Sequence, residues 1–171
     1  MTLLAAMVLV PAFVAFGLAP LLVYLWGRRL PESHETRRSV HVPATPHEVF
    51  TLLADVRAIP RWRKTVRRVT ILGSEPRLRF REHGAQGALE LEIESSRSPD
   101  RLVVRAIPAR PMAFEGSWTY ELEPEADGTR ATLTERGRIG HPIARVFAVH
   151  ALGRATHAER TLAALAHHFR R

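Results

Sequence analysis

The longest hydrophobic pattern with a helical period covers residues 142–169. At about 100° per residue, its apolar side chains fall on one arc of a helix. They belong to Ile143, Phe147, Ala151, Ala155, Ala158, Leu162, Leu165 and Phe169. His150, Arg154 and His157 border this arc. Because packing of the apolar face supplies most of the stability of such a helix, the pattern predicts one long amphipathic helix that lies on an apolar surface.

Two earlier segments alternate between charged and apolar side chains, which is the pattern of strands with one face in water. Residues 77–82 carry arginine at the odd positions, and residues 89–94 alternate leucine or isoleucine with glutamate. A hairpin of these two strands brings opposite charges together in three cross-strand pairs, and a one-residue slip would turn every side chain over. The expected pairs are Arg77 with Glu94, Arg79 with Glu92, and Arg81 with Glu90.

A third strand and a second hairpin extend this sheet. The charge pattern predicts that Arg105 of the third strand lies opposite Glu90. In the second hairpin, a turn that contains Asp-Gly places Trp118 opposite Glu135. Strand alternation then turns both Glu135 and Glu82 toward the apolar face of the sheet.

The segment before these strands predicts a strand and two short helices. Alternating valines indicate a strand that begins near Ser39. Thr45 as N-cap, followed by proline and then by Glu48 three residues after the cap, is typical of a helix start. A second short helix at residues 57–62 and a strand at residues 66–72 follow. The order of elements predicts an α+β fold with a run of six antiparallel strands before the C-terminal helix.

Residues 2–26 contain no charged side chain. As a helix they would be about 37 Å long, which exceeds the roughly 30 Å of a bilayer's hydrocarbon core. We therefore expect a transmembrane anchor at residues 1–27. A cleaved signal peptide is the alternative, but it would carry a basic start and a shorter apolar run. Arginines follow the span and no basic residue precedes it, which predicts a single-pass membrane protein with its domain on the cytoplasmic side.

Residues 28–38 are polar and have no regular period, so they predict a linker between the anchor and a domain at residues 39–171. This remainder has the length of one domain with one core. Our interpretation therefore divides the chain into an anchor, a linker and a single globular unit.

Composition excludes several kinds of site. The chain has no cysteine, which rules out disulfides, thiolate metal sites and cysteine nucleophiles. The histidines form no HExxH pair or compact ligand set, and neither a Walker A motif nor GxGxxG or GxSxG occurs, so we expect no metal and no cofactor. The net charge is +8. Without a recognition helix or an aromatic platform, this charge does not predict nucleic-acid binding.

Six cations surround Trp62 within twelve residues. They either contact anionic lipid headgroups or form an ordinary arginine-rich surface, and the sequence leaves both interpretations open. The six are Arg57, Arg61, Arg63, Lys64, Arg67 and Arg68.

Four segments carry a resemblance to a known superfamily. They are residues 42–50 (VPATPHEVF), residues 53–55 (LAD) with Trp62, residues 116–122 (GSWTYEL) and residues 128–137 (GTRATLTERG). These segments resemble the START/Bet v 1-like, or SRPBCC, superfamily, and within it the polyketide cyclase/dehydrase and lipid-transport-like group. The resemblance covers about residues 36–169. It implies a helix-grip fold, in which a curved antiparallel sheet wraps around a long C-terminal helix, but it transfers no catalytic motif to this sequence.

The expected function is membrane-tethered binding, or transfer, of a hydrophobic small molecule or lipid between the C-terminal helix and the sheet. We expect apolar walls and a polar border around this ligand. The expected walls are Trp118, Tyr120, Leu133 and Phe147, and the border residues are Glu135, His150, Arg154 and His157. The alternative is a polyketide cyclase- or dehydratase-like enzyme in which Glu135 or His157 acts as acid/base catalyst. A third possibility is an interaction protein whose own side chains fill the cavity, and the sequence does not indicate the oligomeric state.

Overall fold

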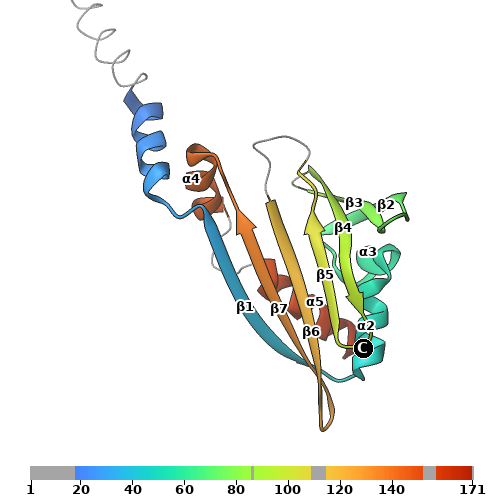
Figure 1. Cartoon of the computed structure of the whole chain (residues 1–171). Helices are drawn as coiled ribbons and strands as arrows, with labels where there is room; N and C mark the ends of the chain where they lie inside the picture. The colour runs from blue at the N-terminus through green and yellow to red at the C-terminus, as the bar shows by residue number, and fades with distance from the viewer. Residues whose placement is uncertain (1–17, 86, 109–114, 152–156, 171) are drawn as a thin grey trace, which may run out of the picture.

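The computed structural model describes residues 18–85, 87–108, 115–151 and 157–170. A helix at residues 18–29 leads into one antiparallel sheet of seven strands in the order β1-β7-β6-β5-β4-β3-β2 (Figure 1). The strands are β1 (Ser33–Val42), β2 (Val66–Gly73), β3 (Arg79–Gly84), β4 (Gly87–Arg97), β5 (Arg101–Ala106), β6 (Glu115–Glu125) and β7 (Gly128–Arg138). The further helices are α2 (Pro46–Ala54), the 3-10 helix η1 (Val56–Ala58), α3 (Ile59–Trp62), α4 (Pro142–Ala151) and α5 (His157–Phe169).

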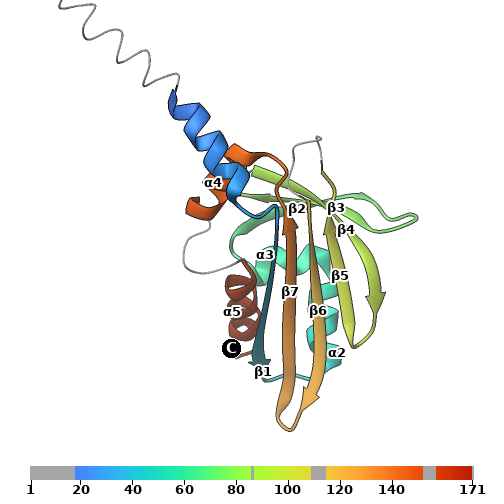
Figure 2. The same ribbon diagram turned by 60° about the vertical axis from the view of Figure 1, so that its left-hand side comes forward.

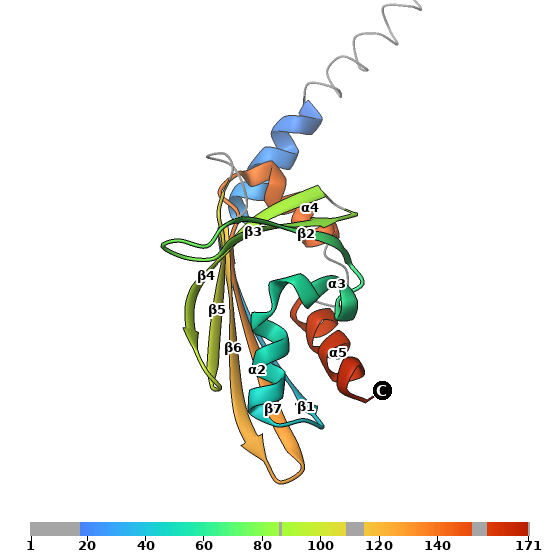
Figure 3. The same ribbon diagram turned by 90° about the vertical axis from the view of Figure 1, so that its right-hand side faces the viewer.

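The sheet is curved, and α2, α3 and α5 cover its concave face, while β2 and β3 bend over the top of these helices (Figure 3). This arrangement confirms the α+β, helix-grip fold class. The core lies between the helices and the sheet, and its largest fully buried side chains include Phe80, Leu102, Leu133 and Leu165. Burial of such side chains supplies the main stabilisation of the fold.

Helix α2 begins as the sequence predicts. The Thr45 hydroxyl accepts the backbone N–H of Glu48, and the Glu48 carboxylate accepts the backbone N–H of Thr45 at 2.8 Å. This reciprocal capping box satisfies two N–H groups that the first turn leaves without partners. It points the apolar face of α2, with Val49 and Leu53, into the core.

Both predicted hairpin registers are confirmed. In the first, Arg79 lies opposite Glu92 and Arg81 lies opposite Glu90. In the second, Trp118 lies opposite Glu135. These two registers could be predicted because the signals that indicate them, cross-strand charge pairs and turn residues, are local in the sequence.

The register between β4 and β5 differs from the prediction. Arg105 lies opposite Glu92 instead of Glu90, and the pairing shifts again between Ile93 and Ser95. Strand β4 continues to Arg97, which pairs with Arg101, so the turn between the two strands is short. Because the first shift is two residues, it leaves the same side chains on the outer face. Glu92 consequently accepts both Arg105 at 2.6 Å and Arg77 at 3.2 Å, and Arg77 does not extend β3 toward Glu94.

The linker prediction was wrong for residues 33–38, which form the first half of β1. Both faces of this segment are polar, so it lacks the alternation that marks a half-buried strand. Pairing with β7 holds it in the sheet, and two cross-strand ion pairs accompany that pairing: Glu35 with Arg136 at 2.9 Å and Glu32 with Arg138 at 3.4 Å. The sheet therefore begins at Ser33.

The prediction of one continuous helix at residues 142–169 was also wrong. Helices α4 and α5 have different axes, and α5 alone packs against the concave face of the sheet (Figures 1 and 3). Helix α5 buries Ala158, Leu162 and Leu165 there. Helix α4 lies beyond the end of the sheet because its Arg145 is buried among backbone carbonyls of the chain before β1 and after β7.

Only the C-terminal part of the expected anchor lies within the described residues. Residues 1–17, which include most of that segment, lie outside them. Within the described ranges, no helix combines the length and the apolar character that a bilayer crossing requires. The helix at residues 18–29 nevertheless exposes large apolar side chains, including Leu18, Leu21, Leu22 and Leu25.

Candidate functional site

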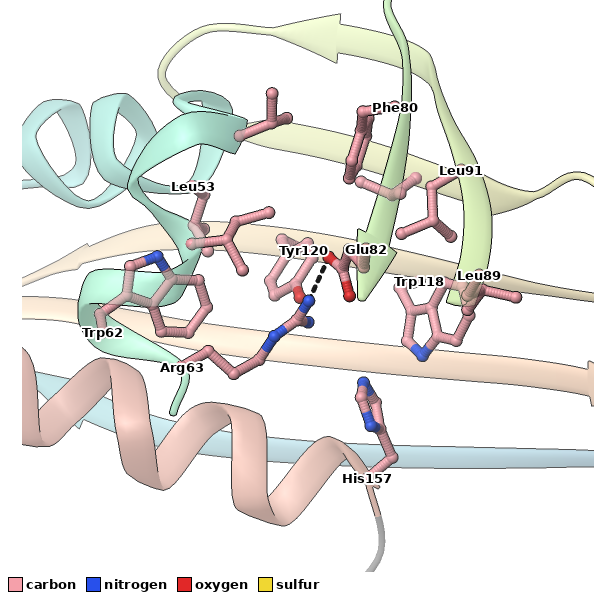
Figure 4. Close-up of a pocket in the computed structure, with 13 residues that line it drawn as sticks. Leu53, Trp62, Arg63, Phe80, Glu82, Leu89, Leu91, Trp118, Tyr120 and His157 are labelled. Atoms are coloured by element: carbon pink, nitrogen blue, oxygen red, sulfur yellow. Dashed lines mark hydrogen bonds and ion pairs between the residues drawn. The ribbon is translucent and has the colours of Figure 1, made fainter. Parts of the chain in front are cut away.

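A cavity of about 50 Å³ lies between the short helices, the bent end of the sheet and the start of α5. Figure 4 shows that its walls come from α2 and α3 on one side, from β3, β4 and β6 on the other, and from α5 below. Most lining side chains are apolar. The lining residues are Leu53, Val56, Ile59, Trp62, Arg63, Phe80, Glu82, Leu89, Leu91, Val104, Trp118, Tyr120 and His157.

The polar centre of the cavity is an ion pair between Arg63 and Glu82 (Figure 4). Only 10% of the Arg63 side chain and 13% of the Glu82 side chain are exposed. Arg63 follows α3 and donates its backbone N–H to Ile59 at 2.8 Å, which turns its side chain back toward the sheet. Burial raises the pKa of the Glu82 carboxyl, and the neighbouring Arg63 charge and hydrogen bond oppose this rise. A buried pair of this kind is costly to break, because either partner alone would be a buried charge.

Two buried N–H groups beside this pair have no hydrogen-bond partner among the described residues. They are Nε of Arg63 and Nε1 of Trp62. The Arg63 guanidinium also lies 5.8 Å from the centre of the Trp62 ring, within the range of a cation–π contact. Because buried polar groups are nearly always hydrogen-bonded, the Arg63 Nε–H is a donor that a bound molecule can satisfy.

His157 and Tyr120 are neutral near pH 7. Burial, together with the charges of Arg63 and Arg160, lowers the pKa of His157 to about 4. Burial raises the pKa of Tyr120 to about 12. The neutral His157 ring lies 5.7 Å from the Trp118 ring and is tilted by 56° against it. The cavity therefore offers uncharged hydrogen-bonding groups beside its single ion pair.

The structure brings three of the sequence-predicted site residues to the cavity, namely Trp118, Tyr120 and His157. Leu133 is fully buried in the core and does not line the cavity. The side chains of Phe147 and His150, and Arg154 as a whole, lie outside the described residues, so their expected contacts stay predictions.

Glu135 is buried, with 8% of its surface exposed, but it lies outside the cavity lining. Its carboxyl lies beside the backbone of Ala158 in the first turn of α5 and beside Trp118. Burial raises the pKa of Glu135, and the charge of His34 and these two neighbours oppose the rise. Because a helix N-terminus carries partial positive charge, the position is that of a structural cap for α5. Arg136 and Arg138 of the same strand bind Glu35 and Glu32, whereas the charge of Arg160 on α5 acts on Glu135.

Sequence reasoning missed most of the helical wall and the buried role of Arg63. Arg63 was counted among the six cations around Trp62, although Ile59, Trp62 and Arg63 stand at positions i, i+3 and i+4 of one short helical segment. Residues with this spacing share a face, so the apolar pair Ile59 and Trp62 was the signal that Arg63 points inward. Arg57, Arg61, Lys64, Arg67 and Arg68 are exposed, as a surface interpretation requires.

Solved structures resemble this fold at low sequence identity. The Zhui aromatase/cyclase from Streptomyces sp. R1128 aligns with a TM-score of 0.65 and 18% identity, over 81% of this chain and 94% of that one. A Thermus thermophilus protein aligns with a TM-score of 0.62 and 23% identity, over 78% of this chain and 95% of that one. The di-domain ARO/CYC StfQ of the steffimycin biosynthetic pathway aligns with a TM-score of 0.62 and 14% identity, over 80% of this chain and 50% of that one. The present chain therefore spans about half the length of the di-domain proteins it matches.

Comparison with protein families is more direct. A search of curated proteins found no match. Residues 33–170 match a family model, and this range coincides with the part of the chain from the start of β1 to the end of α5. The chain therefore belongs to the polyketide cyclase / dehydrase and lipid transport family.

Proposed function

We propose that the cavity binds a small, largely apolar molecule that carries one hydrogen-bond-accepting group. The observation that carries this proposal is the buried Arg63 Nε–H, a donor without a partner among the described residues in a mostly apolar cavity. A carbonyl or hydroxyl oxygen on the ligand would satisfy this donor. The description of the family, which combines polyketide cyclases and lipid transport, is consistent with a ligand of this type.

The volume of the cavity constrains how such a ligand binds. A cavity of about 50 Å³ holds only a few water molecules, at roughly 10–15 Å³ each. A lipid or a polyketide-sized molecule therefore binds only if the walls separate, with α3 or α5 moving away from the sheet. Binding should then change the surroundings of Trp62 and Trp118, which lie on opposite walls (Figure 4).

Tryptophan fluorescence tests this proposal. The chain has three tryptophans, so Trp26→Phe leaves Trp62 and Trp118 as reporters of the cavity. We expect organic extraction of the purified protein to release a hydrophobic molecule, and titration with 1-anilinonaphthalene-8-sulfonate to change the remaining tryptophan emission. Leu89→Phe, which fills the cavity, should weaken this titration, whereas the outward-facing Glu90→Gln on the same strand should not. An empty protein with equal dye affinity in both variants would contradict the proposal.

The membrane tether is a further part of the proposal. It is supported by the uncharged run of residues 2–26 and by the exposed apolar side chains of the helix at residues 18–29. By the positive-inside rule, the arginines that follow the run support a domain on the cytoplasmic side. The full chain should resist carbonate extraction from membranes, while a chain that begins at residue 31 should be released. A reporter enzyme that functions only in the cytoplasm should be active when it is fused to the C-terminus. Recovery of the full chain in the soluble fraction would contradict the tether.

A cyclase- or dehydratase-like activity is the second candidate. The observation that favours it is the presence of two proton-transfer groups in one cavity, a neutral His157 and a Glu82 whose pKa is raised by burial. Glu135, the other sequence candidate, lies opposite Trp118 on the neighbouring strand and outside the lining. With β-keto thioesters as substrates, His157→Phe should abolish product formation and retain dye binding. Glu135→Gln should leave the turnover unchanged, and a rate that is independent of His157 would dismiss this mechanism.

A further inference from the structure

Helix α4 is apolar on nearly every side, yet it does not lie against the sheet. Of its ten residues, only Arg145 and His150 are polar. It lies beyond the end of the sheet, beside the helix at residues 18–29 (Figures 1 and 2). Val146 is buried, whereas Val149 is 60% exposed. A helix that is hydrophobic all round is normally buried in a protein or in a membrane, so the side of α4 that carries Val149 is a candidate for a contact outside the domain.

Arg145 joins α4 rigidly to the helix at residues 18–29. Only 5% of Arg145 is exposed. Its guanidinium donates to the carbonyls of Gly27 and Leu30 at 3.3 and 3.2 Å and to the Glu32 carboxylate at 2.6 Å. It also donates to the carbonyls of Ile139 and Gly140, both at 2.7 Å. The side chain thus connects the chain before β1 with the chain after β7.

Backbone contact reinforces this connection. A Cβ atom on Gly27 would lie 2.0 Å from the carbonyl oxygen of Pro142, so the two segments touch where only glycine fits. The hydrogen bond between the Arg145 guanidinium and the Glu32 carboxylate is charge-assisted, and the same guanidinium donates to several backbone carbonyls. The orientation of α4 relative to the helix at residues 18–29 is therefore determined by packing and hydrogen bonds.

The surface that α4 shares with this helix matches an anionic bilayer in both polarity and charge. Leu18, Leu21 and Leu22 are exposed on the helix, and neither this helix nor α4 contains an acidic residue. Arg28 and Arg29 are exposed at its domain end and form no ion pair with another described residue. The seventeen residues that precede the helix carry no charge either. Apolar side chains bordered by arginine are typical of helices that lie in the headgroup region of anionic membranes.

We propose that α4 is a membrane-docking helix: it lies in the headgroup region of an anionic bilayer beside the anchor, and Arg145 holds it there. The domain consequently rests on the membrane in one orientation instead of moving freely on a linker. Arg145 is a positioning residue that acts through the backbone of residues 27–30. The inference rests on the proposed tether and adds a second, independent point of membrane contact.

Single-cysteine labelling tests the docking because the chain has no native cysteine. A fluorophore is attached to the full chain after Leu22→Cys on the anchor side, Val149→Cys on α4, or Ala126→Cys in the exposed β6–β7 turn at the opposite end. The chain is reconstituted into vesicles of phosphatidylcholine and phosphatidylglycerol that carry a headgroup nitroxide quencher. We expect quenching of the labels at positions 22 and 149 but not at position 126. Vesicles of phosphatidylcholine alone should reduce the quenching at position 149 only.

Arg145→Gln should lower quenching at position 149 to the level at position 126 and leave position 22 unchanged. Glu32→Gln removes one partner of Arg145 and should lower the quenching at position 149 partly. It provides a milder variant if Arg145→Gln impairs folding. Strong quenching at position 22 with none at position 149 would overturn the docking but keep the tether. Failure of the chain to associate with vesicles would overturn the tether as well. Efficient disulfide formation between two Val149→Cys chains without lipid quenching would instead identify a second copy as the partner.

Discussion

Two glutamates on the concave side of the sheet, Glu82 of β3 and Glu135 of β7, share burial but differ in their partners. Burial raises the pKa of both carboxyls. Glu82 faces the cavity and pairs with the full charge of Arg63. Glu135 lies outside the lining, beside the first turn of α5 and Trp118.

The difference shows that the position on a strand determines the direction of a side chain but not its role. Alternation places both glutamates on the concave side. Their partners come from α3 and α5, elements whose positions depend on tertiary packing. A buried carboxylate beside a cation becomes part of a cavity that can bind a polar group, whereas a carboxylate beside helix N–H groups stabilises the helix.

The largest expected effect is on the Glu82 side of the comparison. Arg63→Met leaves a buried carboxylate without its cation, so the free energy of unfolding should fall by about 3–5 kcal/mol. Urea unfolding followed by circular dichroism measures this loss. Arg61→Met, an exposed position on the same short helix, is the matched control and should change stability by less than about 0.5 kcal/mol. The double variant Arg63→Met, Glu82→Met should recover most of the lost stability. A loss of stability in Arg63→Met no greater than that in Arg61→Met would show that the ion pair is not buried in solution.

His157 lines the same cavity as Glu82, and its titration should make stability fall in acid. Its pKa is about 4 in the folded chain and about 6.5 in an unfolded one, so the unfolded chain takes up the proton first as the pH falls. The stabilisation is complete above pH 6.5 and is lost as the pH falls toward 4. Relative to His157→Gln, the wild-type chain should lose up to about 3 kcal/mol over this range. Unfolding at a series of pH values measures the difference, and an NMR titration midpoint of His157 near its ordinary value would contradict it.

Glu135 should show the opposite dependence on pH. Because burial raises its folded pKa, the folded chain keeps this proton to higher pH than the unfolded chain does. The associated stability is present below the ordinary carboxyl pKa and is lost as the pH rises through the folded value. Relative to Glu135→Gln, the free energy of unfolding of the wild-type chain should therefore fall as the pH rises from acid to neutral, and unfolding at a series of pH values measures this difference.

Dye affinity separates the two glutamates directly. Glu135→Gln should leave binding of 1-anilinonaphthalene-8-sulfonate unchanged, since Glu135 does not line the cavity. Glu82→Gln should change dye binding, since Glu82 lines the cavity. Equal effects of the two substitutions on dye binding would remove the distinction between a cavity residue and a helix cap.

The registers of two hairpins could be predicted from sequence because their signals are short-range. Alternating Arg in β3 and Glu in β4 gave the register of the first, and the turn before β7 gave the pairing of Trp118 with Glu135 in the second. The β4–β5 register could not be obtained in this way, because the charge pattern records neither the length of the turn, which follows Arg97, nor the irregularity between Ile93 and Ser95.

The cavity could be predicted only in part. Trp118 and Tyr120 follow from strand alternation, whereas Leu53 and Trp62 reach the cavity through the packing of α2 and α3 against the sheet. The two C-terminal helices were missed for a related reason. Two consecutive helices can continue one apolar arc along the sequence even when their axes diverge in space. Nothing in that arc indicates that Arg145 of α4 forms hydrogen bonds to residues 27–32.

The smallest expected effect comes from the opposite face of the hairpin that contains Glu82. Arg81 and Glu90 form a cross-strand ion pair there, with 40% and 23% of their side chains exposed. Water solvates both charges when the pair is broken, so Arg81→Met should cost only about 0.2–1 kcal/mol, and less at high salt. Unfolding of Arg81→Met and Arg63→Met at low and high salt tests whether burial determines the difference in their stability losses. Arg81 is adjacent to Glu82 on β3, but unlike Arg63 it faces solvent. A loss for Arg81→Met as large as that for Arg63→Met would mean that the outer ionic face stabilises this sheet as strongly as the buried pair does.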